Sequence, residues 1–175
     1  MSDFTLDYRV RPAQIKDLTR LGAIERSASI LFWDTPYTWL VEGEPLPMDL
    51  VYSQFQAGQI WVAVDRSDLV VGFVMTCNLE HGLYLKEIDV NPTHGSRGIG
   101  KMLVKTVLDW ARLHSYNAVF LSTFRDLPWN APFYQKLGFS ILNESALTAG
   151  LQEIRQQEVL AGFPILDRVI MSMTF

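Results

Sequence analysis

The chain has 175 residues, of which 49% are hydrophobic and 19% are charged, and this balance is typical of a folded globular domain rather than a disordered one. The formal net charge is −4 and no cluster of Lys or Arg is longer than a pair, which argues against nucleic-acid binding because that requires a basic stripe. We therefore expect one domain, residues 1–175, that binds no nucleic acid.

Membrane and secretory segments are not evident in the sequence. No apolar run approaches the ~20 residues needed to cross a bilayer, and residues 1–10 lack the basic region and apolar stretch of a secretory signal. The single cysteine, Cys77, excludes an internal disulfide, and its place in an apolar run favours a small buried residue over a nucleophile. These features predict a cytoplasmic protein that does not bind membranes.

The predicted elements begin with a short extended segment, 8–10. Pro12 then suits the first turn of a helix, in which apolar residues recur at helical spacing from Ile15 to Leu31. The segment 32–47 is rich in aromatic residues and prolines, so we expect a loop there. The remaining expected helices are 48–57, 98–114, 131–137 and 144–160, the last capped by Asn143, and the remaining expected strands are 60–64, 69–77, 83–90, 118–121, 139–142 and 169–175.

The order of these elements predicts the fold class. Consecutive strands in the middle of the chain favour antiparallel hairpins, whereas the strand–helix–strand units that follow favour parallel pairing. We therefore expect an α/β (α+β) fold with a mixed sheet and helices on both faces.

The most informative segment is 90–101, Val-Asn-Pro-Thr-His-Gly-Ser-Arg-Gly-Ile-Gly-Lys, in which a strand ends, a glycine-rich turn follows and a helix begins. Its glycines allow a ligand to approach the backbone, and the first helical turn leaves N–H groups unpaired at the positive end of the helix dipole. The segment is not a P-loop, because Met102 rather than Ser or Thr follows the Gly-Lys pair. It predicts an anion site suited to a pyrophosphate, the alternative being a turn that only caps a helix.

This segment resembles motif A of the GNAT superfamily of N-acetyltransferases, which has the form Arg/Gln-x-x-Gly-x-Gly/Ala. Gly98 and Gly100 match the two small positions of the motif. Gly95 stands where Arg or Gln is usual, and Arg97 is a substitute source of charge. The pattern His-Gly-x-Arg-Gly-x-Gly is similar to that of a subgroup of the family.

A second segment, 130–139, resembles motif B of the same superfamily, Phe-Tyr-x-x-x-Gly-Phe. The residues before it complete a Pro-Trp-Asn-Ala-Pro-Phe-Tyr pattern that looks like a subgroup extension. The resemblance covers about residues 69–142. It implies the GNAT fold, a mixed sheet of about seven strands in which the parallel strands 83–90 and 118–123 splay apart and hold the thioester of acetyl-CoA.

The resemblance implies acetyl-CoA as co-substrate, with the pantetheine amides paired to the backbone near Asp89 and Val90 as an added half-strand. No metal is expected, because three scattered His and one Cys give no zinc-ligand spacing. His94 is a weaker candidate for a phosphate contact, and His114 is expected to be structural or solvated. The implied cofactor-binding residues are Asp89, Val90, Gly95, Arg97, Gly98, Ile99, Gly100, Lys101, Asn130, Phe133 and Tyr134.

Acetyl transfer to an amine requires a base for the amine proton and an acid for the departing thiolate. Tyr134 matches the tyrosine of motif B and is expected to be the acid, since a phenol keeps its proton at neutral pH; the alternative is a packing tyrosine. Glu87 is expected to be the base, acting through water, with Asp89 on the same face of the strand as a second candidate. Glu80 and His81 are weaker candidates, and an exposed, ion-paired Glu87 is the alternative.

Aromatic side chains are the candidates for the acceptor site. Trp33, Tyr37 and Trp39 lie in the loop 32–47, where relatives in this superfamily build that site, and Trp129 precedes motif B. They are suited to lining an amine pocket through cation–π contacts or, equally, to packing on the sheet or on a dimer partner.

Two functions of different classes follow from the resemblance. The first is an N-acetyltransferase acting on an amine of a small molecule or peptide by direct attack in a ternary complex. The second is a non-catalytic acyl-CoA-binding sensor or regulatory module, which Gly95 slightly favours. A homodimer is compatible with either, and the sequence does not identify the acceptor.

Overall fold

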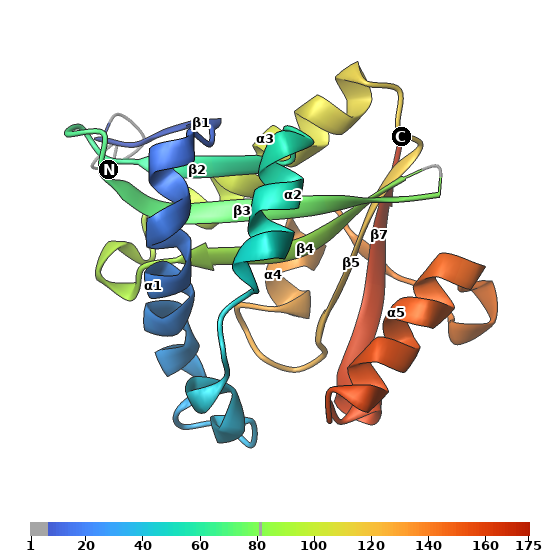
Figure 1. Ribbon diagram of the computed structural model, residues 1–175. Helices are drawn as coiled ribbons and strands as arrows, with labels where there is room; N and C mark the ends of the chain where they lie inside the picture. Colours follow the sequence, from blue (N-terminus) through green and yellow to red (C-terminus); the bar gives the residue numbers. More distant parts are fainter. Residues whose placement is uncertain (1–6, 81) are drawn as a thin grey trace. The chain divides into compact units, whose positions relative to one another are not determined.

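The computed structural model describes residues 7–80 and 82–175, and its strands form a seven-stranded sheet in the order β1-β2-β3-β4-β5-β7-β6 (Figure 1). The sheet is mixed, because β4 and β5 run parallel whereas β5–β7 and β6–β7 are antiparallel. These findings confirm the predicted fold class. The strands are β1 Arg9–Pro12, β2 Ile60–Val64, β3 Val70–Leu79, β4 Gly82–Val90, β5 Ala118–Phe124, β6 Ser140–Ile141 and β7 Arg168–Thr174, and the α-helices are α1 Leu18–Ser29, α2 Met48–Gln56, α3 Ile99–Leu113, α4 Ala131–Lys136 and α5 Ala149–Leu160.

The chain divides into two compact units. The first comprises Met1–Cys77 and Lys86–Leu108, and the second comprises Asn78–Leu85 and Asp109–Phe175. The expectation that residues 1–175 act as one domain stays a prediction.

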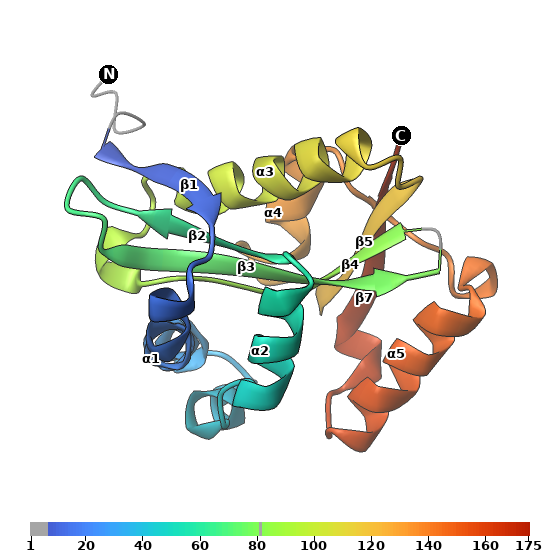
Figure 2. The same ribbon diagram turned by 45° about the horizontal axis from the view of Figure 1, so that its top comes forward.

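The first unit has a core between two helices and the β2–β3 hairpin. Ile60, Val62 and Val64 alternate along β2 and so share one face, onto which α1 and α2 pack. Figure 2 shows α3 on the opposite face of these strands. Helices therefore cover both faces of the sheet in this unit. The core residues are Leu18, Leu21, Ile24, Val51, Ile60, Val62, Val64, Val70, Phe73 and Met75.

The second unit is organised around β5 and β7, which pair from Ala118–Thr174 to Phe124–Arg168. Ile170 of β7 packs with Leu147 and Leu151, so this face of β7 is covered by α5, which runs beside it (Figure 1).

The expected helix 144–160 is the main correction to the predicted elements. Asn143 does cap a helix, but only the 3-10 turn Glu144–Ala146, with its Oδ1 accepting from the Ser145 backbone at 3.0 Å. Leu147 and Thr148 are extended, and α5 begins at Ala149. Burial of Leu147 in the core of the second unit explains the break, because a continuous helix would not direct this side chain inward in the same way.

Other boundaries also differ. Pro12, expected in the first turn of a helix, pairs with Trp61 of β2 as the last residue of β1, so α1 begins only at Leu18. β5 continues to Phe124 rather than stopping at 121, and the strand expected at 139–142 is reduced to Ser140–Ile141. In the part of the chain that the structure describes, no helix has both the length and the apolar character that crossing a membrane requires.

Candidate active site

The end of β4 is fixed by hydrogen bonds of Asn91. Its backbone N–H donates to the carbonyl of Val71 at 2.8 Å, which holds the last residues of β4 against β3. Its side-chain Oδ1 accepts from the backbone N–H of Thr93 at 3.1 Å and so caps a 3-10 turn, Pro92–His94. The strand therefore stops sharply at Val90, and the glycine-rich loop starts from a defined position.

The loop leads into α3 through Gly98, whose φ of +79° is unfavourable for residues with a side chain. The first helical bond of α3 runs from the Met102 N–H to the Gly98 carbonyl at 3.0 Å, so the N–H groups just before Met102 have no intrahelical acceptor. Ile99 is buried and offers only its backbone, whereas Arg97 and Lys101 are exposed. This arrangement fits an anionic ligand such as a pyrophosphate.

Two side chains of this loop are held by Tyr8, just before β1. The Tyr8 hydroxyl accepts from Arg97 Nη1 at 2.8 Å and lies 2.9 Å from His94 Nδ1. The Tyr8 and His94 rings also meet edge-to-face, with centroids 5.7 Å apart. Sequence reasoning did not identify Tyr8, because these contacts span 86 and 89 positions of the chain.

Three carboxyl groups interact in the first unit. Burial, followed by the charges of Glu87 and Glu25, raises the pKa of Asp89 well above its usual value. Asp89 is half-buried as a residue, but its Oδ2 is shielded from solvent and lacks a hydrogen-bond partner among the described residues. Burial also raises the pKa of Glu25, whose carboxylate accepts from the Leu46 N–H at 3.0 Å. Sequence reasoning identified the two residues of β4 and missed Glu25.

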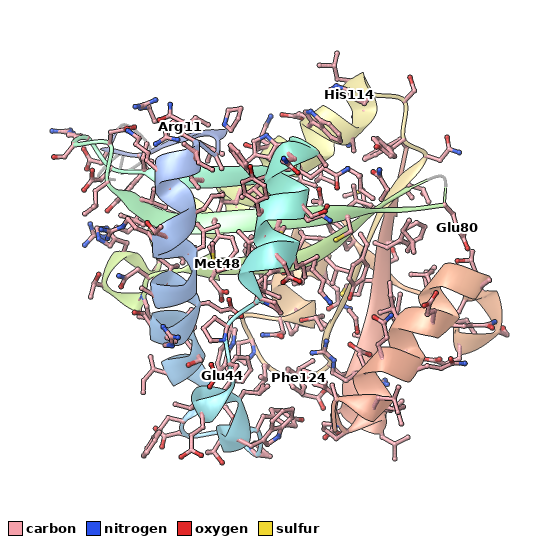
Figure 3. All side chains as sticks on the ribbon, viewed as in Figure 1. Arg11, Glu44, Met48, Glu80, His114 and Phe124 are labelled. Atoms are coloured by element: carbon pink, nitrogen blue, oxygen red, sulfur yellow. The ribbon has the colours of Figure 1, made fainter. Side chains whose placement is uncertain are left out.

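The weaker candidates near β4 have structural roles or lie outside the description. Glu80 Oε1 accepts from the backbone N–H of Gly150 at 2.9 Å, and Figure 3 shows its side chain directed from the end of β3 toward α5. It therefore caps the first turn of that helix. Burial raises the pKa of Cys77, which keeps it a neutral thiol, and His81 lies outside the described residues.

The motif B residues lie on α4 in the second unit. Asn130 Oδ1 accepts from Thr123 Oγ1 at 2.6 Å and from the backbone N–H of Phe124 at 3.3 Å, so neither bond uses its amide nitrogen. Tyr134 is buried, and its ring packs edge-on against Phe133 and Phe139, with centroids 5.1 and 5.7 Å apart. Asn130 thus anchors the start of α4 to β5, and these two bonds leave its side-chain N–H donors unused.

The aromatic candidates for the acceptor site differ in exposure. Trp33 is 62% exposed and Trp39 is 43% exposed, whereas Tyr37 is buried. Trp129, in the second unit, is 38% exposed. His114 stacks on Trp110, with its Nδ1 2.8 Å from the Trp110 carbonyl, as expected for a structural histidine. Within residues 7–80 and 82–175, no group of three or more His, Cys, Asp and Glu is arranged to hold a metal ion.

A family model described as the acetyltransferase (GNAT) family matches residues 26–139. This chain belongs to the GNAT family of acetyltransferases. The match confirms the family that the two sequence motifs indicated and covers both the loop before α3 and the α4 segment.

Relatives of this GNAT protein include rat N-acetyltransferase 8, which is 29% identical over 133 residues. The matched region makes up 66% of this chain and 60% of that protein, so the chain spans less than two thirds of its curated relative.

Solved structures share the fold at low sequence identity. The PaiA N-acetyltransferase of Thermoplasma acidophilum, in complex with coenzyme A, aligns with a TM-score of 0.68 and 17% identity over 96% of this chain and 99% of that one. N-acetylglutamate synthase of Neisseria gonorrhoeae, complexed with coenzyme A and N-acetyl-glutamate, aligns with a TM-score of 0.71 and 13% identity over 95% of this chain and 35% of that one. These likenesses establish the GNAT fold, and both of these solved structures contain coenzyme A.

Proposed function

We propose that the protein is an N-acetyltransferase that moves an acetyl group from acetyl-CoA to an amine of a small molecule or peptide by direct attack in a ternary complex. The observation that carries the proposal is the segment 87–101. In this one stretch, two interacting carboxyl groups are followed by a loop and a helix start suited to a pyrophosphate. Membership of the GNAT family supports the same reaction.

The loop before α3 supplies what the diphosphate of acetyl-CoA needs. Backbone N–H groups around Gly98 to Lys101 provide neutral donors, and Arg97 and Lys101 provide charge. The backbone of Asp89 and Val90 is proposed to pair with the pantetheine amides as an added half-strand. The further residues proposed to bind acetyl-CoA are Gly95, Ile99, Gly100, Asn130, Phe133 and Tyr134.

The base is proposed to be Glu87, working as a pair with Asp89. Attack requires a neutral amine, and most amines carry a proton near neutral pH, so a group must accept that proton. Because burial and neighbouring charge raise the pKa of Asp89, this carboxyl retains a proton more tightly than an isolated carboxyl does. A raised proton affinity of this kind is what a base near neutral pH requires.

Tyr134 is proposed to donate a proton to the departing thiolate of coenzyme A. Its ring is fixed by Phe133 and Phe139, which leaves the phenol little freedom to reorient. A fixed donor stabilises charge that develops in the transition state without paying for reorganisation at that moment.

The acceptor is proposed to be recognised by aromatic side chains. Trp33 and Trp39 are both substantially exposed, so part of each ring is accessible to a ligand. Their faces are suited to a protonated amine before it is neutralised. Tyr37 and Trp129 are proposed as further substrate-binding residues.

Acceptor-dependent release of free thiol from acetyl-CoA tests the proposal. The panel consists of amino acids, polyamines, aminoglycosides and peptides, and acetyl-CoA without an acceptor is the blank. We expect release with at least one class of amine. Release with none of them, together with binding of acetyl-CoA by calorimetry, would establish the non-catalytic acyl-CoA sensor that the replacement at Gly95 favours. Failure of acetyl-CoA to bind would contradict both functions.

A further inference from the structure

The hydroxyl of Tyr8 is placed where it controls two side chains of the loop before α3. Tyr8 is only 8% exposed. It lies directly before β1, 86 positions before His94 in the chain. Its oxygen lies 2.8 Å from Arg97 Nη1 and 2.9 Å from His94 Nδ1. A buried hydroxyl with two partners on one ligand-binding loop does more than fill space, because packing alone would be served by the ring.

The proton positions in this trio follow from its chemistry. A guanidinium only donates, so the Tyr8 oxygen accepts from Arg97. The phenol keeps one proton of its own, which it can donate to His94 Nδ1. In that arrangement a neutral imidazole carries its proton on Nε2. Both loop side chains then keep donors for a ligand. Arg97 donates one N–H to Tyr8 and has others left, and His94 has its Nε2–H.

We propose that Tyr8 is a positioning residue for the diphosphate of the acyl-CoA substrate, holding Arg97 and His94 in the orientation in which they bind it. This inference rests on the proposed use of acetyl-CoA. Arg97 is otherwise an exposed side chain with four rotatable bonds, and ordering such a chain on binding costs free energy that Tyr8 removes in advance. Tyr8 thereby compensates for Gly95, where the family's usual Arg or Gln is missing.

The test is calorimetric titration of coenzyme A into wild-type protein and Tyr8→Phe, which keeps the ring and removes the hydroxyl. We expect Tyr8→Phe to weaken the binding of coenzyme A by about 5- to 10-fold, which corresponds to the loss of one net hydrogen bond. In steady-state kinetics KM for acetyl-CoA rises by a similar factor while kcat at saturation stays unchanged. KM for S-acetylpantetheine, which lacks the diphosphate, also stays unchanged.

Two controls separate positioning from a general structural role. Tyr116→Phe removes another tyrosine hydrogen bond, 2.8 Å long to Asn78, that involves no residue of the loop, and is expected to bind coenzyme A like wild type. In an Arg97→Ala background, Tyr8→Phe is expected to add a smaller loss than it does in wild type, because one of the two side chains that it positions is gone.

Three results would each contradict the inference. Equal affinity of Tyr8→Phe and wild type for coenzyme A would contradict it, and so would an equal loss for S-acetylpantetheine or an undiminished loss in the Arg97→Ala background. In those cases wild type still binds coenzyme A, so the proposed function stands. Absence of coenzyme A binding to wild type would instead overturn the proposed function and this inference together.

Discussion

Asp89 shows how a single residue can be poorly suited to stability and well suited to chemistry. Its Oδ2 is buried without a hydrogen-bond partner among the described residues, and Glu87 and Glu25 add like charge. Leaving a buried polar group unpaired costs about 1–3 kcal/mol. Sites that keep such a cost are often functional, because strain and unpaired charge there serve the reaction.

The first prediction concerns Asp89→Asn and the pH dependence of stability. The folded pKa of Asp89 is raised, so between the ordinary aspartate pKa of about 3.9 and the raised value the native state binds more protons than the unfolded state. Stability contributed by Asp89 therefore falls as pH rises through this window and stays lost above it. Asp89→Asn cannot ionise and should lack this fall. Urea denaturation of both proteins across this pH range checks it, and parallel curves would contradict the buried, charge-repelled carboxyl.

The second prediction concerns Glu87→Gln, which keeps the shape of the side chain and removes its basicity. Loss of a general base typically lowers kcat by about 10²–10⁴-fold. Binding of coenzyme A should be preserved, because no proposed contact to it uses this side chain. The measurement is kcat with the acceptor identified in the thiol-release panel, and recovery of rate at high pH, where the free amine predominates, is expected. An unchanged kcat would exclude Glu87 as base.

Sequence reasoning reached part of this site and not the rest. Glu87 was identified because its strand resembles the GNAT strand in which many relatives carry a carboxylate, and Asp89 because alternation along the strand puts it on the same face. Glu25 and Tyr8 could not be identified, since each joins the site only through tertiary packing from a distant part of the chain.

At the scale of elements, the approach of β3 to the end of β4 depends on a glycine. A Cβ at Gly72 would lie 2.9 Å from the carbonyl oxygen of Asp89 and 3.2 Å from Val90 Cγ2, both too close. Gly22, inside α1, has instead only ordinary contact with Pro45 at 3.5 Å.

The third prediction is that one substitution has opposite effects at these two sites. Gly72→Ala should destabilise by about 1–3 kcal/mol, because the backbone of β4 must move. Gly22→Ala should stabilise by about 0.5–1 kcal/mol, because alanine loses less entropy in a helix. Urea midpoints of the two variants check this. An unchanged midpoint for Gly72→Ala would show that β3 and β4 do not approach each other this closely.

The fourth prediction concerns Glu158, which anchors α5 within the second unit. Its carboxylate accepts from Arg168 Nη2 at 2.6 Å, from Arg155 Nη1 at 3.1 Å and from the Ser122 hydroxyl. Glu158→Ala should destabilise by about 3–5 kcal/mol, because Arg168 loses its carboxylate partner and the buried Arg155 keeps only Glu144. The exposed Glu153 on the same helix is the matched control, and Glu153→Ala should stay within about 0.5 kcal/mol of wild type. Equal denaturation midpoints for Glu158→Ala and wild type would show that Glu158 does not contribute to stability.

At the scale of the whole molecule, element order and sheet type were predictable, because hydrophobic periodicity and turn residues report them locally. The start of α5 was not, since the pattern 144–160 reads as one helix and only the inward turn of Leu147 interrupts it. The ion network of Glu158 was equally invisible, because its members come from three separate elements. The cytoplasmic location and the homodimer stay predictions.

We propose that an acetyl group passes from acetyl-CoA to the nitrogen of an acceptor. Mass spectrometry of the acceptor, after incubation with wild-type protein and acetyl-CoA, distinguishes this transfer from hydrolysis, which would also release thiol. We expect an N-acetylated product that forms with wild type and is strongly reduced with Glu87→Gln. Thiol release without any acetylated amine would contradict it and would identify a hydrolase on the same fold.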